Sequence, residues 1–231
     1  MLRSSRTDLA HRMLRPSRTD LARLVLRGIV ASALAACTPS PAAPTLPRCP
    51  IDRAVVIVSQ ADAARLTGCT TLRSITIRSG GSLDLSVLGA LTTLTSDLTI
   101  GPTVAVEEVT LRGLSTVEGA IHVVGNGLLQ GIFLPKLERA GRVVIDGNVA
   151  ITTLSLPRLA AVRGAFRVTD NASLELIDIP ALTSVHDELV LTHNPKLTLV
   201  ESGELRAAGQ VELDAPKLSA ELTQRLRSLM P

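Results

Sequence analysis

Hydrophobic and polar residues alternate over short stretches in the second half of the chain. Residues 166–168 (FRV) and 189–191 (LVL) are examples, and this alternation predicts short strands with one buried face. Such runs are followed by asparagines that lie 22, 23 and 23 residues apart. These are Asn126, Asn148, Asn171 and Asn194. A period of this length is typical of a solenoid in which each repeat forms one coil.

Three positions in each repeat are always aliphatic, and they lie three, six and eleven residues after the asparagine. They hold Leu129, Ile151, Leu174 and Leu197; Ile132, Leu154, Ile177 and Val200; and Leu137, Leu159, Leu182 and Leu205. We expect these side chains to stack on their counterparts in the neighbouring coils. The sequence therefore predicts an all-β, parallel β-solenoid of about seven coils across residues 49–218.

The asparagines are expected at sharp corners of the coil. Asparagine tolerates the left-handed backbone conformation, and its amide can bond the equivalent amide one coil away. A structural ladder of this kind is favoured over a catalytic role. Pro135, Pro157 and Pro180 lack an N–H group, so we expect them at corners or at the starts of strands.

The N-terminal segment has the pattern of an export signal. Residues 1–10 recur almost unchanged as residues 13–22, which makes Met13 an alternative start. Arginines precede an apolar run over residues 28–36, which is too short to span a bilayer.

The junction Leu34-Ala35-Ala36-Cys37 resembles the lipobox of bacterial lipoproteins. This resemblance implies that residues 1–36 are removed and that Cys37 carries a lipid anchor to the membrane. It further implies a cell-envelope location, with the outer membrane favoured by Thr38, on its periplasmic or surface-exposed side. An ordinary signal peptide followed by an incidental cysteine is the alternative. Residues 37–48 then form a lipidated cysteine and a proline-rich linker.

With Cys37 assigned to the lipid, Cys49 and Cys69 remain, and an oxidising compartment favours a disulfide between them. Two free thiols are the alternative. Between these cysteines the sequence predicts a strand over residues 54–58 and a short helix capped by Ser59 and Asp62. A second helix is predicted over residues 219–231, so helices are expected to cap both ends of the solenoid.

Charge argues against a nucleic-acid partner. The formal net charge of +3 arises in residues 1–36, because the rest of the chain has 17 basic and 19 acidic residues. The sequence has two phenylalanines and neither tyrosine nor tryptophan, so stacking platforms for bases are not expected.

The repeat from Leu156 to Asn171 has the form Leu-Pro-x-Leu-x-x-Val-x-Gly-x-Phe-x-Val-x-x-Asn. Together with the order of Cys49, strand, short helix and Cys69, it resembles the receptor L domain. That family has a leucine-rich-repeat-like, right-handed β-helix and occurs in receptor ectodomains and in bacterial and fungal surface proteins. The resemblance covers about residues 49–218 and implies a right-handed coil.

Candidate catalytic groups are few. His122, His186 and His193 lie at different offsets from their asparagines, so a metal site is not expected. Asp146 and Asp170 lie in adjacent repeats, and two facing carboxylates are the arrangement of polysaccharide-active enzymes. Aspartate is also a common turn residue, which is the favoured interpretation.

The sequence therefore predicts a non-enzymatic, lipid-anchored envelope protein whose solenoid binds an unidentified protein or envelope component, without a cofactor. A structural or adhesion role without a discrete ligand, and a polysaccharide-active enzyme, are the alternatives. The predicted binding face consists of outward strand positions and the residues beside the corner. These are Arg142, Arg167, Glu188, Asp146, Asp170 and His193.

Overall fold

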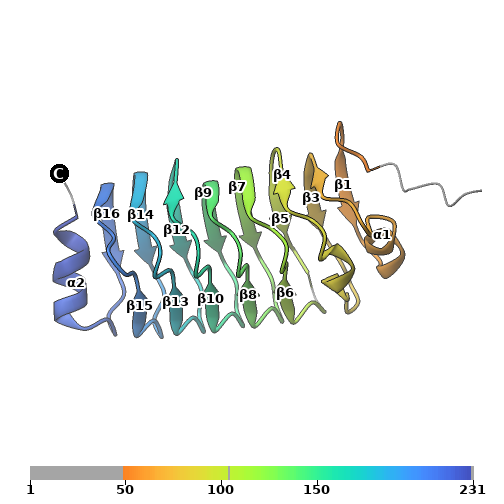
Figure 1. The fold of residues 1–231 in the computed structure, drawn as a ribbon. Helices are drawn as coiled ribbons and strands as arrows, with labels where there is room; N and C mark the ends of the chain where they lie inside the picture. Colours follow the sequence, from red (N-terminus) through yellow and green to blue (C-terminus); the bar gives the residue numbers. More distant parts are fainter. Residues whose placement is uncertain (1–48, 104, 230–231) are drawn as a thin grey trace, which may run out of the picture. The chain divides into compact units, whose positions relative to one another are not determined.

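Stacked parallel strands make up most of the chain in the computed structural model, which describes residues 49–103 and 105–229 (Figure 1). They form a β-solenoid of about seven coils, so the predicted fold is confirmed. The predicted signal segment, the predicted lipid attachment site at Cys37 and the proline-rich segment that follows it lie outside the described residues.

The strands form two parallel sheets, and the smaller sheet begins only at the coil that follows β5. The larger sheet has 11 strands and the smaller has five. The larger contains β1 (Ala54–Ile57), β2 (Thr71–Leu72), β3 (Ser74–Ile77), β4 (Thr93–Leu94), β5 (Leu98–Ile100), β7 (Thr116–Val124), β9 (Arg139–Asp146), β11 (Ala161–Val162), β12 (Phe166–Thr169), β14 (Ser184–Thr192) and β16 (Ala207–Asp214). The smaller contains β6 (Glu108–Thr110), β8 (Gly131–Phe133), β10 (Thr153–Ser155), β13 (Leu176–Asp178) and β15 (Leu199–Glu201).

The register of the strands follows the sequence repeat. In the larger sheet Phe166 is aligned with Val143 on one side and with Leu189 on the other. In the smaller sheet Leu154 is aligned with Ile132 in the same way. All the aliphatic positions predicted to point inward are buried. Each fully buried Leu, Ile or Val contributes about 1.5–3 kcal/mol, so this stacking is the main source of stability.

Coils of 22 and 23 residues differ at one corner. The register of β7 against β9 shifts between Val117 and Ala120, and β14 shifts against β16 in the same way. The backbones approach closely at this corner, since a Cβ atom added at Gly141 would lie 2.5 Å from the carbonyl oxygen of Glu118. Only glycine fits there. The strands on both sides of the corner keep their alignment whichever length the coil has.

A disulfide and a short helix close the first coil. Cys49 is bonded to Cys69, which stabilises the fold by roughly 3 kcal/mol in the chain-entropy account. Helix α1 (Gln60–Ala64) begins after Ser59, and a capping box joins Ser59 to Asp62. A 3₁₀ helix, η1 (Leu85–Leu88), contacts α1. The predicted N-terminal cap is therefore present.

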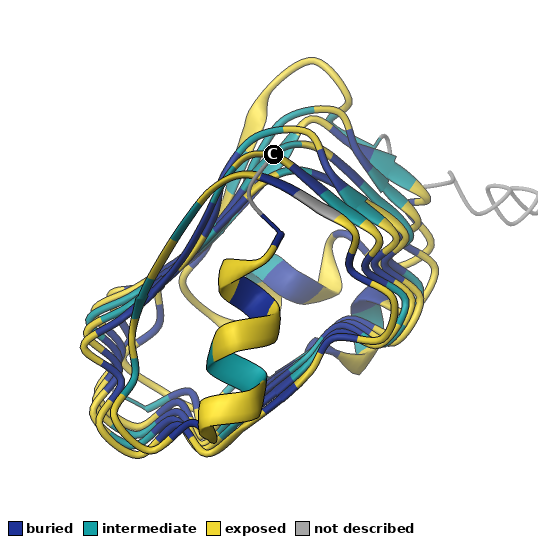
Figure 2. Cartoon of the chain, turned by 90° about the vertical axis from the view of Figure 1, so that its left-hand side faces the viewer, coloured by how far each residue is buried: buried dark blue, intermediate teal, exposed yellow. Residues whose placement is uncertain are grey.

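Helix α2 (Ala220–Arg227) covers the last coil. Seen along the axis of the coils, it lies across their open end (Figure 2). Ser219 is its N-cap, and Leu226 is buried against the core. The guanidinium group of Arg225 donates to the carbonyl oxygen of Ser202 at 3.0 Å. Among the described residues, no helix has the length and apolar character needed to cross a membrane.

The four asparagines form a fully buried, hydrogen-bonded column. Oδ1 of Asn148 accepts from the backbone N–H and the side-chain amide of Asn126, at 3.1 and 2.8 Å. In the same way, Oδ1 of Asn171 accepts from the backbone N–H and side-chain amide of Asn148, and Oδ1 of Asn194 accepts from those of Asn171. The column begins at Thr103, whose N–H and hydroxyl both donate to Oδ1 of Asn126. Each asparagine amide also donates to a backbone carbonyl, so these buried polar groups are satisfied.

The residue before each asparagine, and not the asparagine itself, adopts the left-handed backbone conformation. Gly125, Gly147, Asp170 and His193 have φ angles of 67°, 61°, 54° and 54°. The expectation that asparagine supplies this conformation was wrong. Asparagine occupies its position because one amide can donate and accept at the same time in a space that water does not reach.

Replacement of Asn148 by alanine is expected to lower the free energy of unfolding by about 3 kcal/mol or more, because several buried donors and acceptors lose their partners. Urea denaturation followed by circular dichroism measures this loss. Thr152→Ala is the matched control, since the Thr152 hydroxyl bonds a carbonyl at an exposed position and its loss should cost less than about 0.5 kcal/mol. Equal losses in the two variants would contradict a stabilising role of the column.

Candidate functional site

One row of outward side chains runs along the larger sheet from β1 to β16, and we call it the outer column. Each member is aligned with the next by strand register. The members are Val56, Thr76, Thr99, His122, Val144, Arg167, Val190 and Glu212. The first five carry no carboxylate, lysine or arginine. The charged members are confined to the C-terminal coils, so the column has an uncharged part and a charged part.

An ion pair lies in the charged part. Nη2 of Arg167 is 2.5 Å from Oε1 of Glu188, and Nε of Arg167 also donates to that oxygen, at 2.6 Å. Arg142 is exposed and directly precedes Val143. Val143 is aligned with Phe166 and Phe166 with Leu189, which follows Glu188, so Arg142 lies two coils from Glu188. The structure therefore brings together these three predicted residues on one surface. The pair is partly exposed, so it contributes at most about 1 kcal/mol to folding.

Two carboxylates flank His193 beside the corner. Nδ1 of His193 is 3.4 Å from Oδ1 of Asp170, and Nε2 is 3.9 Å from Oδ2 of Asp214. All three side chains are about two-thirds exposed. Asp214 was not predicted, because its repeat lacks an asparagine. The alternation over residues 211–214 was the available signal, since it aligns Asp214 with Thr192.

Asp146 and Asp170 do not form the facing pair considered from the sequence. Asp146 is aligned with Thr169 and accepts a hydrogen bond from its hydroxyl. Asp170 follows Thr169 and faces His193 in the next coil. Because each carboxylate is directed to a different partner, this geometry gives no support to the two-carboxylate mechanism of glycosidases.

The three histidines of the described chain lie at different positions of the coil, because their distances in sequence from the asparagines differ. His122 lies in the outer column, His186 is exposed, and His193 lies at the corner. Within residues 49–103 and 105–229, no group of three or more histidine, cysteine, aspartate or glutamate side chains is arranged to hold a metal ion.

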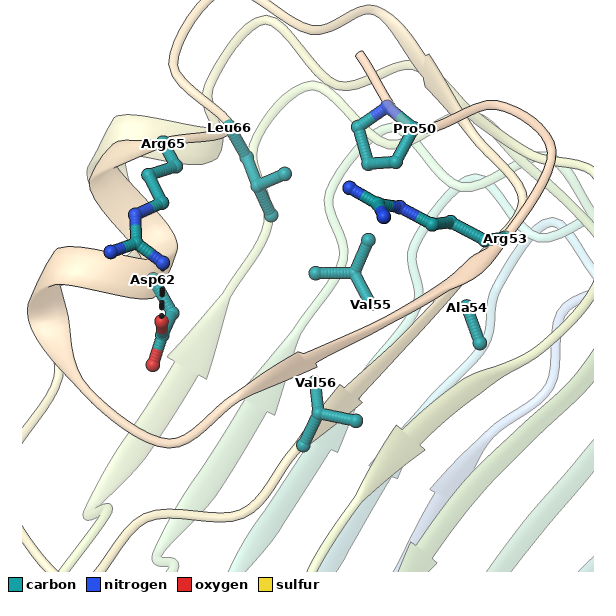
Figure 3. Close-up of a pocket in the computed structure, with 8 residues that line it drawn as sticks. All are labelled: Pro50, Arg53, Ala54, Val55, Val56, Asp62, Arg65 and Leu66. Atoms are coloured by element: carbon teal, nitrogen blue, oxygen red, sulfur yellow. Dashed lines mark hydrogen bonds and ion pairs between the residues drawn. The ribbon is translucent and has the colours of Figure 1, made fainter. Parts of the chain in front are cut away.

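A hollow of about 400 Å³ lies between β1 and α1 at the N-terminal end (Figure 3). Asp62 on α1 pairs with Arg65 at 3.4 Å, and Arg53 projects from the chain on the other side. The hydroxyl of Ser59 is the main cause that lowers the pKa of Asp62, and backbone N–H groups and Arg65 act in the same direction. The lining residues are Pro50, Arg53, Ala54, Val55, Val56, Asp62, Arg65 and Leu66.

A second hollow, of about 650 Å³, lies on the outer face of the smaller sheet. Phe133 points outward there, and its ring lies over Gly131, where an added Cβ atom would be 2.4 Å from a ring carbon. The other lining residues are Glu108, Thr110, Arg112, Pro135, Lys136 and Arg158. Phe133 was not among the site residues predicted from the sequence. The inward position of Ile132 was the signal, because the next residue in a strand points to the opposite face.

Comparison of the chain with protein-family models, with curated proteins and with solved structures gives no match. The resemblance to the receptor L domain therefore stays an expectation based on the repeat motif.

The lowered pKa of Asp62 predicts a pH-dependent cap. A carboxyl group with a pKa below its ordinary value of 3.8 stabilises the fold above that pH, and this contribution is lost as the pH falls through the lowered pKa. Asp62→Asn should therefore lower the melting temperature at neutral pH, and the difference from the wild type should vanish in strong acid. Thermal scans over this pH range measure the effect.

Asp52→Asn is the matched control, because the carboxylate of Asp52 makes no hydrogen bond or ion pair within the described residues. Its melting temperature should follow that of the wild type at every pH. A difference between wild type and Asp62→Asn that stays constant from neutral pH to strong acid would contradict the assignment.

Proposed function

We propose that this chain is a non-enzymatic, lipid-anchored protein of the cell envelope, exported and held at the outer membrane through Cys37. Its β-solenoid acts as a binding module for a protein or another envelope component. The export signal and the lipobox-like junction support the location, and the proline-rich linker provides distance between the anchor and the module.

The observation that carries the binding proposal is the uncharged part of the outer column. Over five successive coils the outward positions hold valine, threonine and histidine, and Val56 is 51% exposed. Val58 lies two residues after Val56, and Val124 lies two residues after His122. Their side chains are 56% and 39% exposed. A flat apolar and hydroxyl-bearing strip on a solvent-facing sheet is typical of an interaction surface.

The charged residues lie where the rim of such a surface is expected. Arg167 adjoins the uncharged strip, Glu188 and Glu212 lie in the next two coils, and His193 with its two aspartates lies beside the corner. Protein interfaces commonly combine a centre depleted of charge with a polar rim. The rim charges steer and orient a partner, whereas the centre supplies most of the affinity.

The face is also held rigid before any partner arrives. The strands of its uncharged strip, except β1 at the edge, are paired on both sides, and the asparagine column links the coils from Thr103 onward. Because few backbone or side-chain groups need ordering on binding, the entropic cost of association is small. The resemblance to the receptor L domain, a fold found in receptor ectodomains and surface proteins, supports the same function.

Lipidation of Cys37 is tested by metabolic labelling with a fatty-acid analogue and by fractionation of the host envelope. The wild-type chain should carry the label and sediment with membranes, whereas Cys37→Ser should be unlabelled and found in the soluble fraction. Cys49→Ser is the control, and it should retain the label. An unmodified Cys37 in the wild-type protein would refute the anchor.

The binding face is tested by crosslinking in the native envelope and quantitative mass spectrometry of captured proteins. Val144→Glu combined with Arg167→Ala should reduce recovery of the main partner by about tenfold, because it places a charge in the strip and removes a rim cation. Arg206→Ala is the matched control, since Arg206 is an exposed arginine paired with Glu204 outside this face. Equal recovery with both proteins, each with an unchanged circular dichroism spectrum, would count against this face.

A further inference from the structure

We propose that the hollow around Phe133 on the smaller sheet binds an anionic glycan in which carboxylated sugars alternate with uncharged ones. This surface is separate from the outer column, so the inference does not depend on the proposed protein-binding face. Strands β6 and β8 carry part of this hollow (Figure 1). We call its lining residues the glycan groove; they are Glu108, Thr110, Arg112, Phe133, Pro135, Lys136 and Arg158.

Phe133 supplies a flat apolar platform. Its ring is folded back over Gly131 on the same face of β8, so the ring lies along the sheet. An outward phenylalanine in a chain with only two aromatic residues has no role in the core, which holds Phe166 instead. The C–H face of a pyranose ring packs against such a platform, whereas charged or strongly hydrated groups do not.

Cations without partners line the groove. Lys136 and Arg158 occupy the same position in adjacent coils, because each comes three residues after the aligned pair Phe133 and Ser155. Equivalent positions in neighbouring coils are about 4.8 Å apart, so these like charges repel each other. Within the described residues neither forms an ion pair, and the same holds for Arg112.

This repulsion is relieved by a bound anion. Arg163 and Arg167 have carboxylate partners at the surface, whereas Arg112 and Arg158, like Arg78 and Arg142, form no ion pair within the described residues. The arginines of the groove leave their guanidinium groups available, and a guanidinium group binds a carboxylate through two parallel hydrogen bonds. Arg112 and Arg158 lie two coils apart, about 10 Å, which is the length scale of a disaccharide.

Acidic and polar groups between the cations favour a ligand whose charges are spaced out. Glu108 lies in the same groove, and Thr110 donates its hydroxyl to it. A smaller hollow of about 240 Å³ beside Phe133 is lined by Glu107, Glu108, Gln130, Gly131, Thr152 and Thr153. Such groups bond sugar hydroxyls. A nucleic acid carries a phosphate at every step, so it would bring phosphates against Glu108.

The groove continues along the stack in the direction of the C-terminal coils. A neighbouring hollow of about 460 Å³ shares Arg158 and adds Arg139 and Glu138. The alternation of cation and carboxylate therefore extends past one disaccharide. This continuation indicates an oligosaccharide or polysaccharide and not a single acidic sugar.

Isothermal titration calorimetry of the purified full chain tests the proposal, with a hyaluronan octasaccharide as the probe. In this oligosaccharide a carboxylated sugar alternates with an N-acetylated neutral one. The wild type should bind it, and Lys136→Ala combined with Arg158→Ala should weaken binding by about tenfold or more, since two charge-assisted contacts are lost. Phe133→Leu, which removes the ring at a half-buried outward position, should also weaken binding.

Three controls make the result decisive. Arg206→Ala removes a cation outside the groove and should bind as the wild type does. A neutral chitin oligosaccharide should bind more weakly than hyaluronan. Residues 1–36, with their seven arginines, are identical in every variant, so they add the same background. No binding of hyaluronan, an equal loss with Arg206→Ala, or tighter binding of an oligothymidine than of hyaluronan would overturn the proposal.

Discussion

The structure depends on a requirement that buried amides meet a partner. A coil that turns sharply leaves backbone N–H and C=O groups inside, where water does not reach them, and each unsatisfied group costs about 1–3 kcal/mol. Asparagine provides an acceptor and two donors on a short side chain, and four of them complete one another across successive coils. Their column fixes the stacking distance, and the aliphatic core fills the remaining interior.

The interior is not available to a partner. In the described residues it is occupied by Leu, Ile and Val side chains, so the groups that a partner could reach lie on outward strand positions, at corners or in the caps. The coil repeats such positions at regular intervals, which turns single residues into rows. The outer column and the groove around Phe133 are both products of this repetition, and they differ because the residues in the rows differ.

The repeat made the fold predictable, whereas surface details were less accessible. Leu154 and its equivalents revealed the inward positions because burial demands the same residue type in every coil. The asparagine spacing was informative for the same reason, but the left-handed residue was misplaced by one, since Gly125 and His193 share a backbone conformation and no side-chain property.

Contacts that occur once leave no periodic signal. Asp214 lies near His193, but it belongs to a final repeat in which the motif is degenerate. Asp146 is bonded to Thr169 because strand register decides which residues face each other, and the sequence predicts that register only approximately. Phe133 follows from simple alternation, yet its position over Gly131 depends on the absence of a side chain at one neighbouring site. Within the part of the chain that the structure describes, Lys136 and Arg158 form no ion pair, and this follows only from the positions of all the nearby carboxylates.

The corner that absorbs the difference between 22- and 23-residue coils has a consequence for how such a protein changes over time. Insertion of one residue in most strands would move every following side chain to the opposite face. At this corner an extra residue is accommodated by a shift in register, and the alignment of the strands that flank it is preserved. Lineages can therefore lengthen a coil there and remodel the surface beside it, while the interior and the ladder stay intact.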